Sequence, residues 1–597
     1  MDIASPTGKV STWLARLGDA LASADIEAAA ALFGEDCYWR DLVAFTWNLK
    51  TMEGRPEIAE MLGATLAQVK PEAIALDGEA SELDGIMEGW FTFETAAGRG
   101  RGHVRLRGDT CWTLLTTLQE LKGHEEPNGT RRRKGVAHGQ HQDRRSWAEE
   151  RSAEQAELGV TRQPYVVVIG GGQGGIALGA RLRQLDVPTI ILEKSERAGD
   201  SWRKRYKSLC LHDPVWYDHL PYLKFPENWP VFSPKDKIGD WLEAYVKVME
   251  LNYWTKSEAL KADWDETAKE WRVKVNRDGR EITLRPRQLV LATGMSGVPN
   301  APDLPGRELF RGVRCHSSKF PGSDGWAGRR AVVVGSNNSA HDIAADLWEH
   351  GAEVTMVQRS STHVSKSETL MELALGQLYS EQAVRNGITT EIADLIFASV
   401  PYKVLPLLQK PIAAAQKERD RDLYERLERA GFLLDFGEDE TGLFMKYLRR
   451  GSGYYIDVGA SELVANGSIK LARGQVARLT ETGIVLEDGT ELPADLVVFA
   501  TGYTSMNGWA AKLISQEVAD RVGKVWGLGS GTRKDPGPWE GELRNMWKPT
   551  RQEGLWFHGG NLHQSRHYSQ FLALQLKARQ AGIPTPVYAL APVHHRA

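Results

Sequence analysis

Apolar runs, glycine turns and helical patterns follow one another twice in the second part of this 597-residue chain. Residues 166–169 read Val-Val-Val-Ile and lead directly into Gly-Gly-Gly-Gln-Gly-Gly, after which apolar residues recur at helical intervals. Residues 331–334 form a similar apolar run, followed by Gly335 and a second helical pattern. Strand, turn and helix in this order are typical of parallel α/β folds. We therefore expect two such units after residue 160.

The first 123 residues have a different pattern. Apolar residues recur there at helical intervals, at Trp13, Leu14, Leu17 and Leu21. Short aromatic segments follow, and they alternate or cluster as strands do. Helices followed by an antiparallel sheet predict a small α+β domain over residues 1–123.

Residues 124–160 separate these two regions. They are rich in charge, Gly and Asn and poor in aliphatic residues, which is typical of a linker. We interpret the basic run 131–134 inside this segment as solvated linker, with a targeting or polyanion-binding patch as the alternative.

The first glycine turn has the spacing of a dinucleotide site. Gly170 permits a tight turn, Gly172 lets the backbone approach a pyrophosphate, and Gly175 lets the helix pack closely on the strand, while Gly174 is a further residue expected at the cofactor. A second apolar strand pattern ends in Glu193, where a carboxylate can accept hydrogen bonds from ribose hydroxyls. The pattern predicts a bound dinucleotide here.

The second turn keeps the first glycine and replaces the other two. Asn337 and Ala340 stand where the first turn has glycine, and we expect Asn to tolerate unusual backbone angles there. Arg359 takes the place of the acid, which favours a 2′-phosphate and therefore NADP. The residues expected to contact this cofactor are Gly335, Asn337, Asn338, Ser339 and Arg359. The alternative is a decayed duplicate that only packs.

Charge and cysteine content narrow the classes of partner. The formal net charge is −4, so we expect no general attraction to nucleic acid or to an anionic membrane. No apolar run reaches the ~20 residues that would span a bilayer, and the beginning of the sequence lacks the apolar core of a secretory signal. The four cysteines form no CxxC pair, which indicates a reducing compartment and no thiolate metal site. We expect a cytoplasmic protein without a bound metal.

One short motif resembles the fingerprint of a known family. Residues 310–320 match the pattern FxGxxxHxxx(F/Y/W) of class B flavoprotein monooxygenases, through Phe310, Gly312, His316 and Phe320. Other stretches resemble parts of this family that lie near the flavin, and they contain Trp202, Thr293, Gly294 and Gly502. The resemblance covers residues 163 to about 580.

Within that class the chain is most similar to the flavin-containing monooxygenase branch, which includes the plant YUCCA enzymes. The resemblance implies two Rossmann-like domains, an FAD-binding one over 161–320 and 481–597 and an NADP-binding one over 321–480 with a helical insertion. Residues 1 to about 122 resemble the NTF2-like domains, in which Asp36 or Asp41 would be a candidate base. Docking or dimerisation without chemistry is the alternative for that domain.

The activity that the resemblance implies uses FAD and NADPH as cofactors. One atom of O2 would enter a small organic substrate through a C4a-(hydro)peroxyflavin, by N- or S-oxygenation or oxidative decarboxylation. His316 is the catalytic candidate, coupling the motion of the two domains, with a structural hydrogen-bonding role as the alternative. A homodimer is a candidate assembly.

Three other functions stay open. A Baeyer-Villiger monooxygenase acting on ketones is the first, because Pro321 follows Phe320 as Pro follows Trp in that branch. A flavin-dependent disulfide reductase would need a redox cysteine pair, and Cys210 stands alone. The third is a non-catalytic binding module built on the N-terminal domain.

Overall fold

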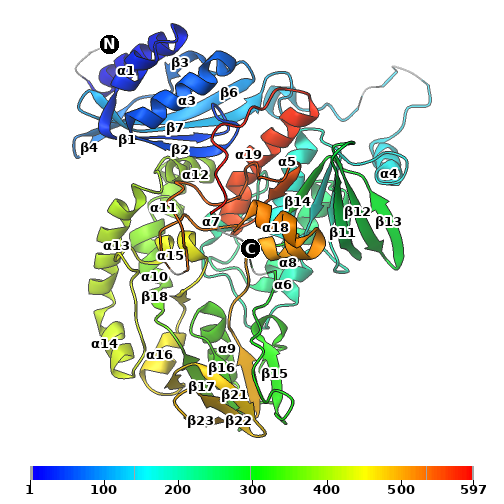
Figure 1. Cartoon of the computed structure of the whole chain (residues 1–597), viewed down its shortest axis with the longest axis vertical. Coiled ribbons are helices and arrows are strands. Elements are labelled where there is room, and N and C mark those ends of the chain that lie inside the picture. Colours follow the sequence, from blue (N-terminus) through cyan, green and yellow to red (C-terminus); the bar gives the residue numbers. More distant parts are fainter. Residues whose placement is uncertain (1–4, 137, 140–141, 296, 533, 595–597) are drawn as a thin grey trace.

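The computed structural model describes residues 5–136, 138–139, 142–295, 297–532 and 534–594. Its three largest sheets lie in three parts of the molecule (Figure 1). The N-terminal part forms one end, a second sheet with its helices lies beside it, and a third sheet forms the opposite end. A group of helices flanks the last two sheets.

The N-terminal part consists of helices packed on a seven-stranded sheet. Its helices are α1 (Pro6–Ala22), α2 (Ile26–Ala31) and α3 (Gly54–Val69). Its strands are β1 (Phe33–Leu42), β2 (Leu49–Glu53), β3 (Glu72–Leu76), β4 (Ser81–Leu83), β5 (Ile86–Glu94), β6 (Gly98–Arg107) and β7 (Thr110–Leu121). The order is β2-β1-β7-β6-β5-β3, with β4 beside β5. The sheet is not purely antiparallel as expected, because β1 pairs with β7 in parallel.

The segment predicted as a linker contains regular structure. A 3-10 turn spans Gly129–Arg131, and helix α4 spans Trp147–Glu157. Ser146 caps α4, and a capping box with Glu149 closes its first turn. Residues 137, 140 and 141 of the segment lie outside the described residues.

The first parallel sheet has the order β10-β9-β8-β14-β25. Its strands are β8 (Val166–Ile169), β9 (Thr189–Leu192), β10 (Tyr253–Trp254), β14 (Gln288–Leu291) and β25 (Leu555–Phe557). Its helices are α5 (Gln173–Gln184), α6 (Asp200–Arg203), α7 (Val215–Asp218), α8 (Lys235–Val248), α17 (Asn507–Leu513), α18 (Gln516–Val522) and α19 (Leu562–Gln580). A separate antiparallel sheet contains β11 (Ser257–Asp265), β12 (Glu270–Arg277) and β13 (Arg280–Leu284). The central strands are buried throughout, which explains their continuous apolar runs.

The second parallel sheet has the order β15-β24-β16-β17-β20. Its strands are β15 (Val313–His316), β16 (Arg330–Val334), β17 (Glu353–Gln358), β20 (Lys470–Arg473) and β24 (Leu496–Phe499). The 3-10 turn Ser317–Lys319 and helices α9 (Asn338–Glu349) and α16 (Ala460–Ala465) accompany it, with an antiparallel meander of β21 (Val476–Thr480), β22 (Gly483–Leu486) and β23 (Glu491–Pro493).

The predicted boundaries at residues 320 and 480 do not follow these sheets. Both β15 and β24 lie outside the range 321–480, yet they pair with each other in the second sheet. Local patterns cannot reveal this pairing, because the two strands lie about 180 residues apart and meet only through long-range packing.

Helices fill most of the region 365–460, the segment where the sequence predicts a helical insertion. They are α10 (Ser367–Leu370), the π-helical turn Met371–Leu375, α11 (Glu381–Arg385), α12 (Thr390–Ala398), α13 (Leu405–Arg419), α14 (Arg421–Arg429) and α15 (Leu443–Arg450). The short parallel strands β18 (His363–Lys366) and β19 (Tyr454–Asp457) pair where the chain leaves and rejoins the second unit.

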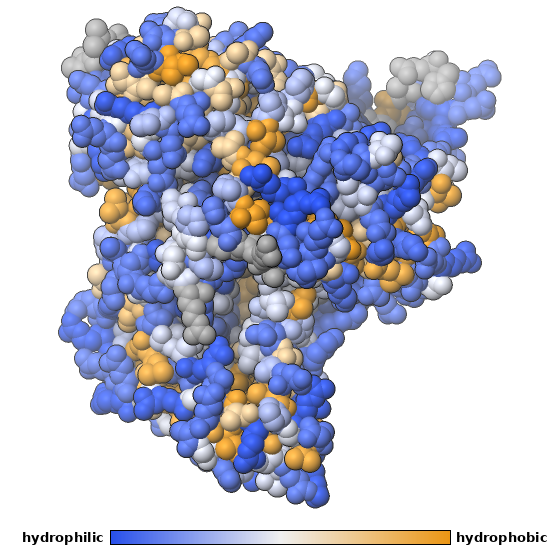
Figure 2. Space-filling view, viewed as in Figure 1, coloured by the Kyte–Doolittle hydropathy of each residue, from blue (hydrophilic) through white to orange (hydrophobic). Residues whose placement is uncertain are grey.

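Hydrophilic side chains cover most of the face in Figure 2, and apolar residues lie there in small separate patches. Among the described residues, no helix combines the length and the apolar character needed to cross a membrane.

Candidate cofactor sites at two glycine turns

The first glycine turn follows β8 and leads into α5. Gly170 has φ +111°, and a Cβ atom there would lie 2.3 Å from the carbonyl oxygen of Ala292. A Cβ atom on Gly175 would lie 2.0 Å from the carbonyl oxygen of Gly170. Both positions therefore require glycine. Gly172 caps α5, and the nearest atom to a Cβ there is 3.8 Å away, so a ligand can approach its backbone.

Glu193 lies directly after β9, beside this turn. Its side chain is buried, and it accepts hydrogen bonds from the Gly171 N–H at 3.1 Å and the Ser195 N–H at 2.8 Å. Each carboxylate oxygen thus holds one backbone donor and keeps a second lone pair. This arrangement fixes an acceptor at the position where a dinucleotide presents its ribose hydroxyls.

The start of α19 approaches the start of α5. Gly559 and Gly560 both have left-handed φ angles and precede Asn561, which caps α19. A Cβ atom on Gly174 would lie 3.3 Å from the Gly559 Cα atom. Two helix N-termini with positive dipole ends therefore converge here, which suits a ligand with a diphosphate and an electron-rich ring.

Trp202 and the first Ala-Thr-Gly segment border the same region. The Trp202 indole N–H donates to Gln173 Oε1 at 3.3 Å, at the first residue of α5. Thr293 and Gly294 follow β14, and the Thr293 hydroxyl is buried without a hydrogen-bond partner among the described residues. An unpaired buried hydroxyl beside open glycine backbone fits a polar cofactor that supplies the missing partner.

His558 belongs to this site, and the sequence reasoning missed it. It follows β25 directly, is fully buried, and neither ring nitrogen has a hydrogen-bond partner among the described residues. Burial lowers the pKa of His558 to about 3, so the ring is neutral. Its position directly before Gly559 and Gly560 was the available signal in the sequence.

The second glycine turn repeats the geometry of the first. Gly335 has φ +134°, and a Cβ atom there would lie 2.4 Å from the carbonyl oxygen of Ala500. Asn337 caps α9 with φ −99° and ψ −170°, close to the φ −77° and ψ −169° of Gly172. The expectation that Asn337 adopts an unusual backbone conformation is therefore wrong. Its extended conformation is open to every residue.

Asn338 and Ser339 start α9, and Asn338 already has a structural partner. The Asn338 Oδ1 atom accepts a hydrogen bond from the Ile456 N–H at 2.9 Å, which ties α9 to β19. Within the part of the chain that the structure describes, its amide NH2 group donates no hydrogen bond, so it can bind a ligand. Ser339 is half-buried in the first turn of α9, where backbone N–H groups face the end of the sheet.

Arg359 follows β17 and differs sharply from Glu193. Its side chain is exposed, and within the described residues it forms no hydrogen bond or ion pair. A guanidinium without an internal partner, at the strand end next to the turn, is available for a phosphate.

His316 ends β15 and holds the loop after β24. Its Nε2 atom lies 3.1 Å from the Gly502 carbonyl oxygen, and its Nδ1 atom accepts a hydrogen bond from the Ser318 N–H at 3.1 Å. Nε2 therefore carries the proton and donates to Gly502. Burial lowers the pKa of His316, which favours this neutral form.

Gly502 itself lies where the two sheet-bearing units are connected. The Asn300 N–H donates to the Gly502 carbonyl at 2.9 Å, and the Thr504 N–H donates to the Val298 carbonyl at 3.0 Å. The two chain segments that cross between the sheets thus pair with each other, and His316 is bonded to one of them.

The polar candidates of the N-terminal part have structural partners. Asp41 is fully buried and accepts hydrogen bonds from the N–H groups of Phe45 and Thr46 and from the hydroxyls of Thr46 and Thr116. Burial raises the pKa of Asp41 to about 6. Asp36 is exposed and accepts from the Tyr38 hydroxyl. The geometry favours docking over chemistry for this part.

Three further polar side chains near the two turns have partners within the protein. The Tyr447 hydroxyl donates to Gln564 Oε1 at 2.5 Å, so Gln564 binds α15. His567 is buried among aromatic rings, and burial lowers its pKa to about 3. The His212 Nε2 atom lies 3.4 Å from Asp342 Oδ1 on α9.

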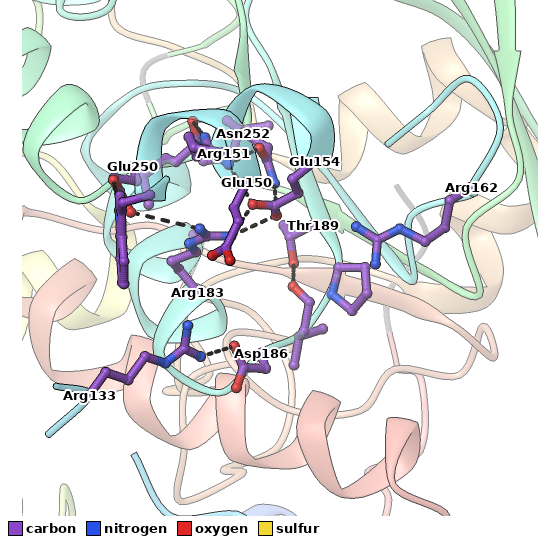
Figure 3. A pocket seen from close by; sticks show the side chains of 16 residues that line it. Arg133, Glu150, Arg151, Glu154, Arg162, Arg183, Asp186, Thr189, Glu250 and Asn252 are labelled. Atoms are coloured by element: carbon purple, nitrogen blue, oxygen red, sulfur yellow. Dashed lines mark hydrogen bonds and ion pairs between the residues drawn. The ribbon is translucent and has the colours of Figure 1, made fainter. Parts of the chain in front are cut away.

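A separate cavity of about 320 Å³ lies between α4 and α5 (Figure 3). It opens at the amino end of β9, whereas dinucleotides bind at the carboxyl ends of parallel strands. Glu154 binds both Arg183, at 2.6 Å, and Arg151, at 2.9 Å, and Glu250 lies 3.8 Å from Arg183, so the two positive and two negative lining charges balance. Among the described residues, no cluster of three or more histidine, cysteine or acidic side chains could hold a metal ion.

The fold and the two turns define a class of proteins with two dinucleotide-binding units. The pyridine nucleotide-disulphide oxidoreductase family matches residues 167–399. In solved structures, the chain is similar to cyclohexanone monooxygenase bound to ε-caprolactone, with 18% identity, a TM-score of 0.50 and coverage of 70% of this chain and 88% of that one. A cyclohexanone monooxygenase mutant from Rhodococcus sp. Phi1 bound to NADP⁺ has 17% identity, the same TM-score and coverage of 70% and 86%.

Curated relatives identify the family. The chain is 30% identical over 366 residues to the indole-3-pyruvate monooxygenase YUCCA1 of Oryza sativa subsp. japonica, which covers 60% of this chain and 82% of the relative. It is 29% identical over 348 residues to a probable indole-3-pyruvate monooxygenase, YUCCA8, of Arabidopsis thaliana, with coverage of 57% and 74%. The chain belongs to this family of flavin-dependent monooxygenases. It is an oxidoreductase, and FAD and NADPH are its cofactors.

Proposed function

We propose that the first glycine turn binds FAD, that the second binds NADPH, and that the enzyme oxygenates a small organic substrate where the two units meet. One observation carries the assignment of the sites: equivalent strand ends have opposite charges. The buried Glu193 carboxylate suits the ribose hydroxyls of FAD, and the exposed Arg359 guanidinium suits the 2′-phosphate of NADPH.

FAD, once reduced by NADPH, would activate O2 and supply one oxygen atom to the substrate. The residues of the chain bind and orient the two cofactors. The N-termini of α5 and α19 offer N–H groups to the diphosphate and the flavin ring. The buried Thr293 hydroxyl and the neutral His558 ring present further polar atoms at the same place.

His316 has a positioning role in this proposal. Its hydrogen bond to Gly502 connects the end of β15 to the crossing segments between the two units. This bond would restrain the crossing segment at Gly502 when the units move relative to each other, which supports the coupling role.

For the substrate, we propose a small organic molecule that is oxygenated at nitrogen or sulfur, or decarboxylated oxidatively. Indole-3-pyruvate is the first compound to test, because the rice relative carries that activity in its name. A cyclic ketone is the second, because Pro321 follows Phe320. Lactone formation from the ketone would assign the Baeyer-Villiger reaction instead.

The N-terminal part supports a docking role for an NTF2-like domain. Its helices cover one face of the sheet, and the other face lies against α12 and α19. A homodimer and a cytoplasmic location stay predictions.

The test compares NADPH consumption with peroxide release for a sulfide, a tertiary amine, a cyclic ketone and an indole-3-keto acid. We expect NADPH to bleach the absorbance of bound flavin without oxygen, and one substrate class to suppress peroxide release. Failure of NADPH to bleach the flavin would overturn the enzymatic proposal and favour a non-catalytic binding module.

A further inference from the structure

The Arg40 side chain extends from the N-terminal sheet into the rest of the chain, which contains the two glycine turns and is called the catalytic part below. Arg40 lies on β1, and its side chain is 1% exposed. The guanidinium forms a bidentate pair with Glu542, through Nε at 2.7 Å and Nη2 at 2.8 Å. The Thr51 hydroxyl of β2 donates to the same carboxylate at 2.8 Å. Two strands of the N-terminal sheet therefore hold Glu542 in a dry interface.

The same guanidinium also binds two helices of the catalytic part. Its Nη1 atom donates to the Ala398 carbonyl at 2.8 Å, at the last residue of α12, where a cation suits the helix dipole. Its Nη2 atom donates to the Tyr568 hydroxyl of α19 at 3.1 Å. Arg40 also lies over the Tyr402 ring, with 4.5 Å between Cζ and the ring centroid.

Contacts continue from Tyr568 to the glycine turn before α19. The Tyr568 ring stacks on the Trp547 ring, with 3.9 Å between centroids and 7° between planes. The Trp547 indole N–H donates to the Gly559 carbonyl at 3.2 Å. Trp547 has φ +62°, a left-handed conformation that is strained for a large side chain and persists only where its surroundings hold it.

Gly559 lies beside the turn assigned to FAD, since a Cβ atom on Gly174 would come within 3.3 Å of its Cα. Continuous contacts therefore lead from Arg40 through Tyr568 and Trp547 to the proposed flavin site. Every side chain in this series is at least 97% buried. Water cannot replace these hydrogen bonds without opening the interface.

We propose that Arg40 is a positioning residue for the oxygenation reaction. Through Tyr568 and Trp547, the N-terminal domain would hold the Gly559 turn in the place that couples NADPH oxidation to oxygenation. The inference rests on the proposed function of the first turn. In this inference the N-terminal domain affects the reaction by positioning the Gly559 turn, and none of its own residues takes part in the chemical steps.

The expected consequence is a change in product. Coupled turnover is NADPH + H⁺ + O2 + substrate → NADP⁺ + oxygenated substrate + H2O. Uncoupled turnover is NADPH + H⁺ + O2 → NADP⁺ + H2O2, in which both oxygen atoms leave as peroxide. A displaced Gly559 turn would admit water or misplace the ring, and so favour the second reaction.

The test uses the full-length flavin-loaded enzyme and three variants. Trp547→Phe removes the donor to Gly559 and keeps an aromatic ring. Tyr568→Phe removes the hydroxyl that meets Arg40 and keeps the stack. The double variant Arg40→Met with Glu542→Met removes both buried charges, because Arg40→Met alone would leave Glu542 unpaired and endanger folding.

Arg105 provides a matched control. It also crosses from the N-terminal sheet, and it binds the Ser399 carbonyl at 3.1 Å and the Ser399 hydroxyl at 2.8 Å, without a hydrogen bond to α19. Arg105→Gln should therefore reduce the melting temperature and leave the peroxide yield per NADPH unchanged. A variant that only weakens the interface between the N-terminal sheet and the rest of the chain should likewise lower the melting temperature without changing the peroxide yield.

We expect Trp547→Phe and the double variant to raise the peroxide yield per NADPH by about five- to tenfold, with Tyr568→Phe between these and wild type. Anaerobic bleaching of the flavin by NADPH should still go to completion in each variant, which shows that the flavin stays bound and reducible. Peroxide yields equal to wild type in Trp547→Phe and the double variant would overturn the inference. If wild type itself shows no bleaching, the proposed function fails instead, so the two failures are distinguishable.

Discussion

The two glycine turns have nearly the same backbone and opposite chemistry at the neighbouring strand ends. Gly170 and Gly335 are both left-handed, and each packs against the carbonyl of the alanine in an Ala-Thr-Gly segment. At the third glycine position, Gly175 touches the Gly170 carbonyl, whereas Ala340 accommodates its own Cβ in the second unit. The comparison teaches that the first glycine is required in both turns, whereas the third is required only in the first turn, and that the two turns differ most in the charge at the neighbouring strand end, Glu193 in one and Arg359 in the other.

The largest effect should come from adding a Cβ atom to either first glycine. We expect Gly170→Ala and Gly335→Ala to destabilise the protein by about 3 kcal/mol or more, because each combines left-handed strain with a clash against a carbonyl. Gly170→Ala should lose FAD on purification, and Gly335→Ala should keep FAD but resist bleaching by NADPH. Flavin absorbance and thermal unfolding measure these outcomes.

Gly489→Ala is the matched control for this prediction. Gly489 has φ +89°, and no atom lies within 4 Å of the place that a Cβ would take, so this change isolates the backbone strain. Its cost should be about 1–2 kcal/mol. If Gly335→Ala lowers the free energy of unfolding by no more than Gly489→Ala does, the close packing of the second turn on Ala500 does not contribute to stability.

Arg359→Ala tests whether the second turn prefers NADPH because this guanidinium binds the 2′-phosphate. Loss of a bidentate phosphate contact should raise the KM for NADPH by about 10- to 100-fold, with little change for NADH, which lacks the 2′-phosphate. Steady-state kinetics with both nucleotides measure this, and Arg385→Ala on the exposed helix α11 is the control. An equal rise in both KM values would contradict the assignment of Arg359 to the phosphate.

The helices that follow the two turns, α5 and α9, also differ at an equivalent position. His341 of α9 occupies the position that Ile176 has in α5, six residues after the first glycine. Burial lowers the pKa of His341 to about 4, whereas the unfolded chain has the ordinary value of about 6.5. The unfolded state therefore binds more protons, and stability is lost as the pH falls from about 6.5 toward 4.

His341→Ile should reduce this acid sensitivity. At pH 5, protonation of His341 in the unfolded chain lowers the free energy of unfolding of the wild type by about 2 kcal/mol. The variant has no titratable group at this position and does not lose this stability. Melting temperatures at pH 7.5 and pH 5 measure the difference, with wild type falling further than the variant. An identical fall in both would show that other buried histidines dominate the acid response.

Asn337→Gly should have the smallest effect. Because Asn337 already has the extended backbone of Gly172, glycine brings no conformational relief, and the KM for NADPH should change by less than about threefold. The reverse change, Gly172→Asn, should weaken FAD binding clearly more, since a side chain would enter the open approach at that turn. A large gain in NADPH affinity in Asn337→Gly would show that the natural turn is compromised.

Much of the site could be predicted from local sequence. The turns at Gly170 and Gly335 and the strand ends at Glu193 and Arg359 depend on residues close along the chain. His558 was missed because its role depends on α5 and α19 converging, which no short motif encodes. The conformation of Asn337 was misjudged, since the angle at that position follows from the capping of α9 and not from the residue type.

The sequence by itself determined two parallel α/β units, their turns, the opposite charges at the strand ends beside them, and the fingerprint around His316. These features arise from apolar periodicity, glycine and charge over short distances. Only the tertiary structure decided that β15 and β24 share one sheet, that His316 binds the crossing segment at Gly502, and that Arg40 reaches the helix of the proposed flavin site. Those contacts join residues far apart in the chain, and long-range packing alone selects them.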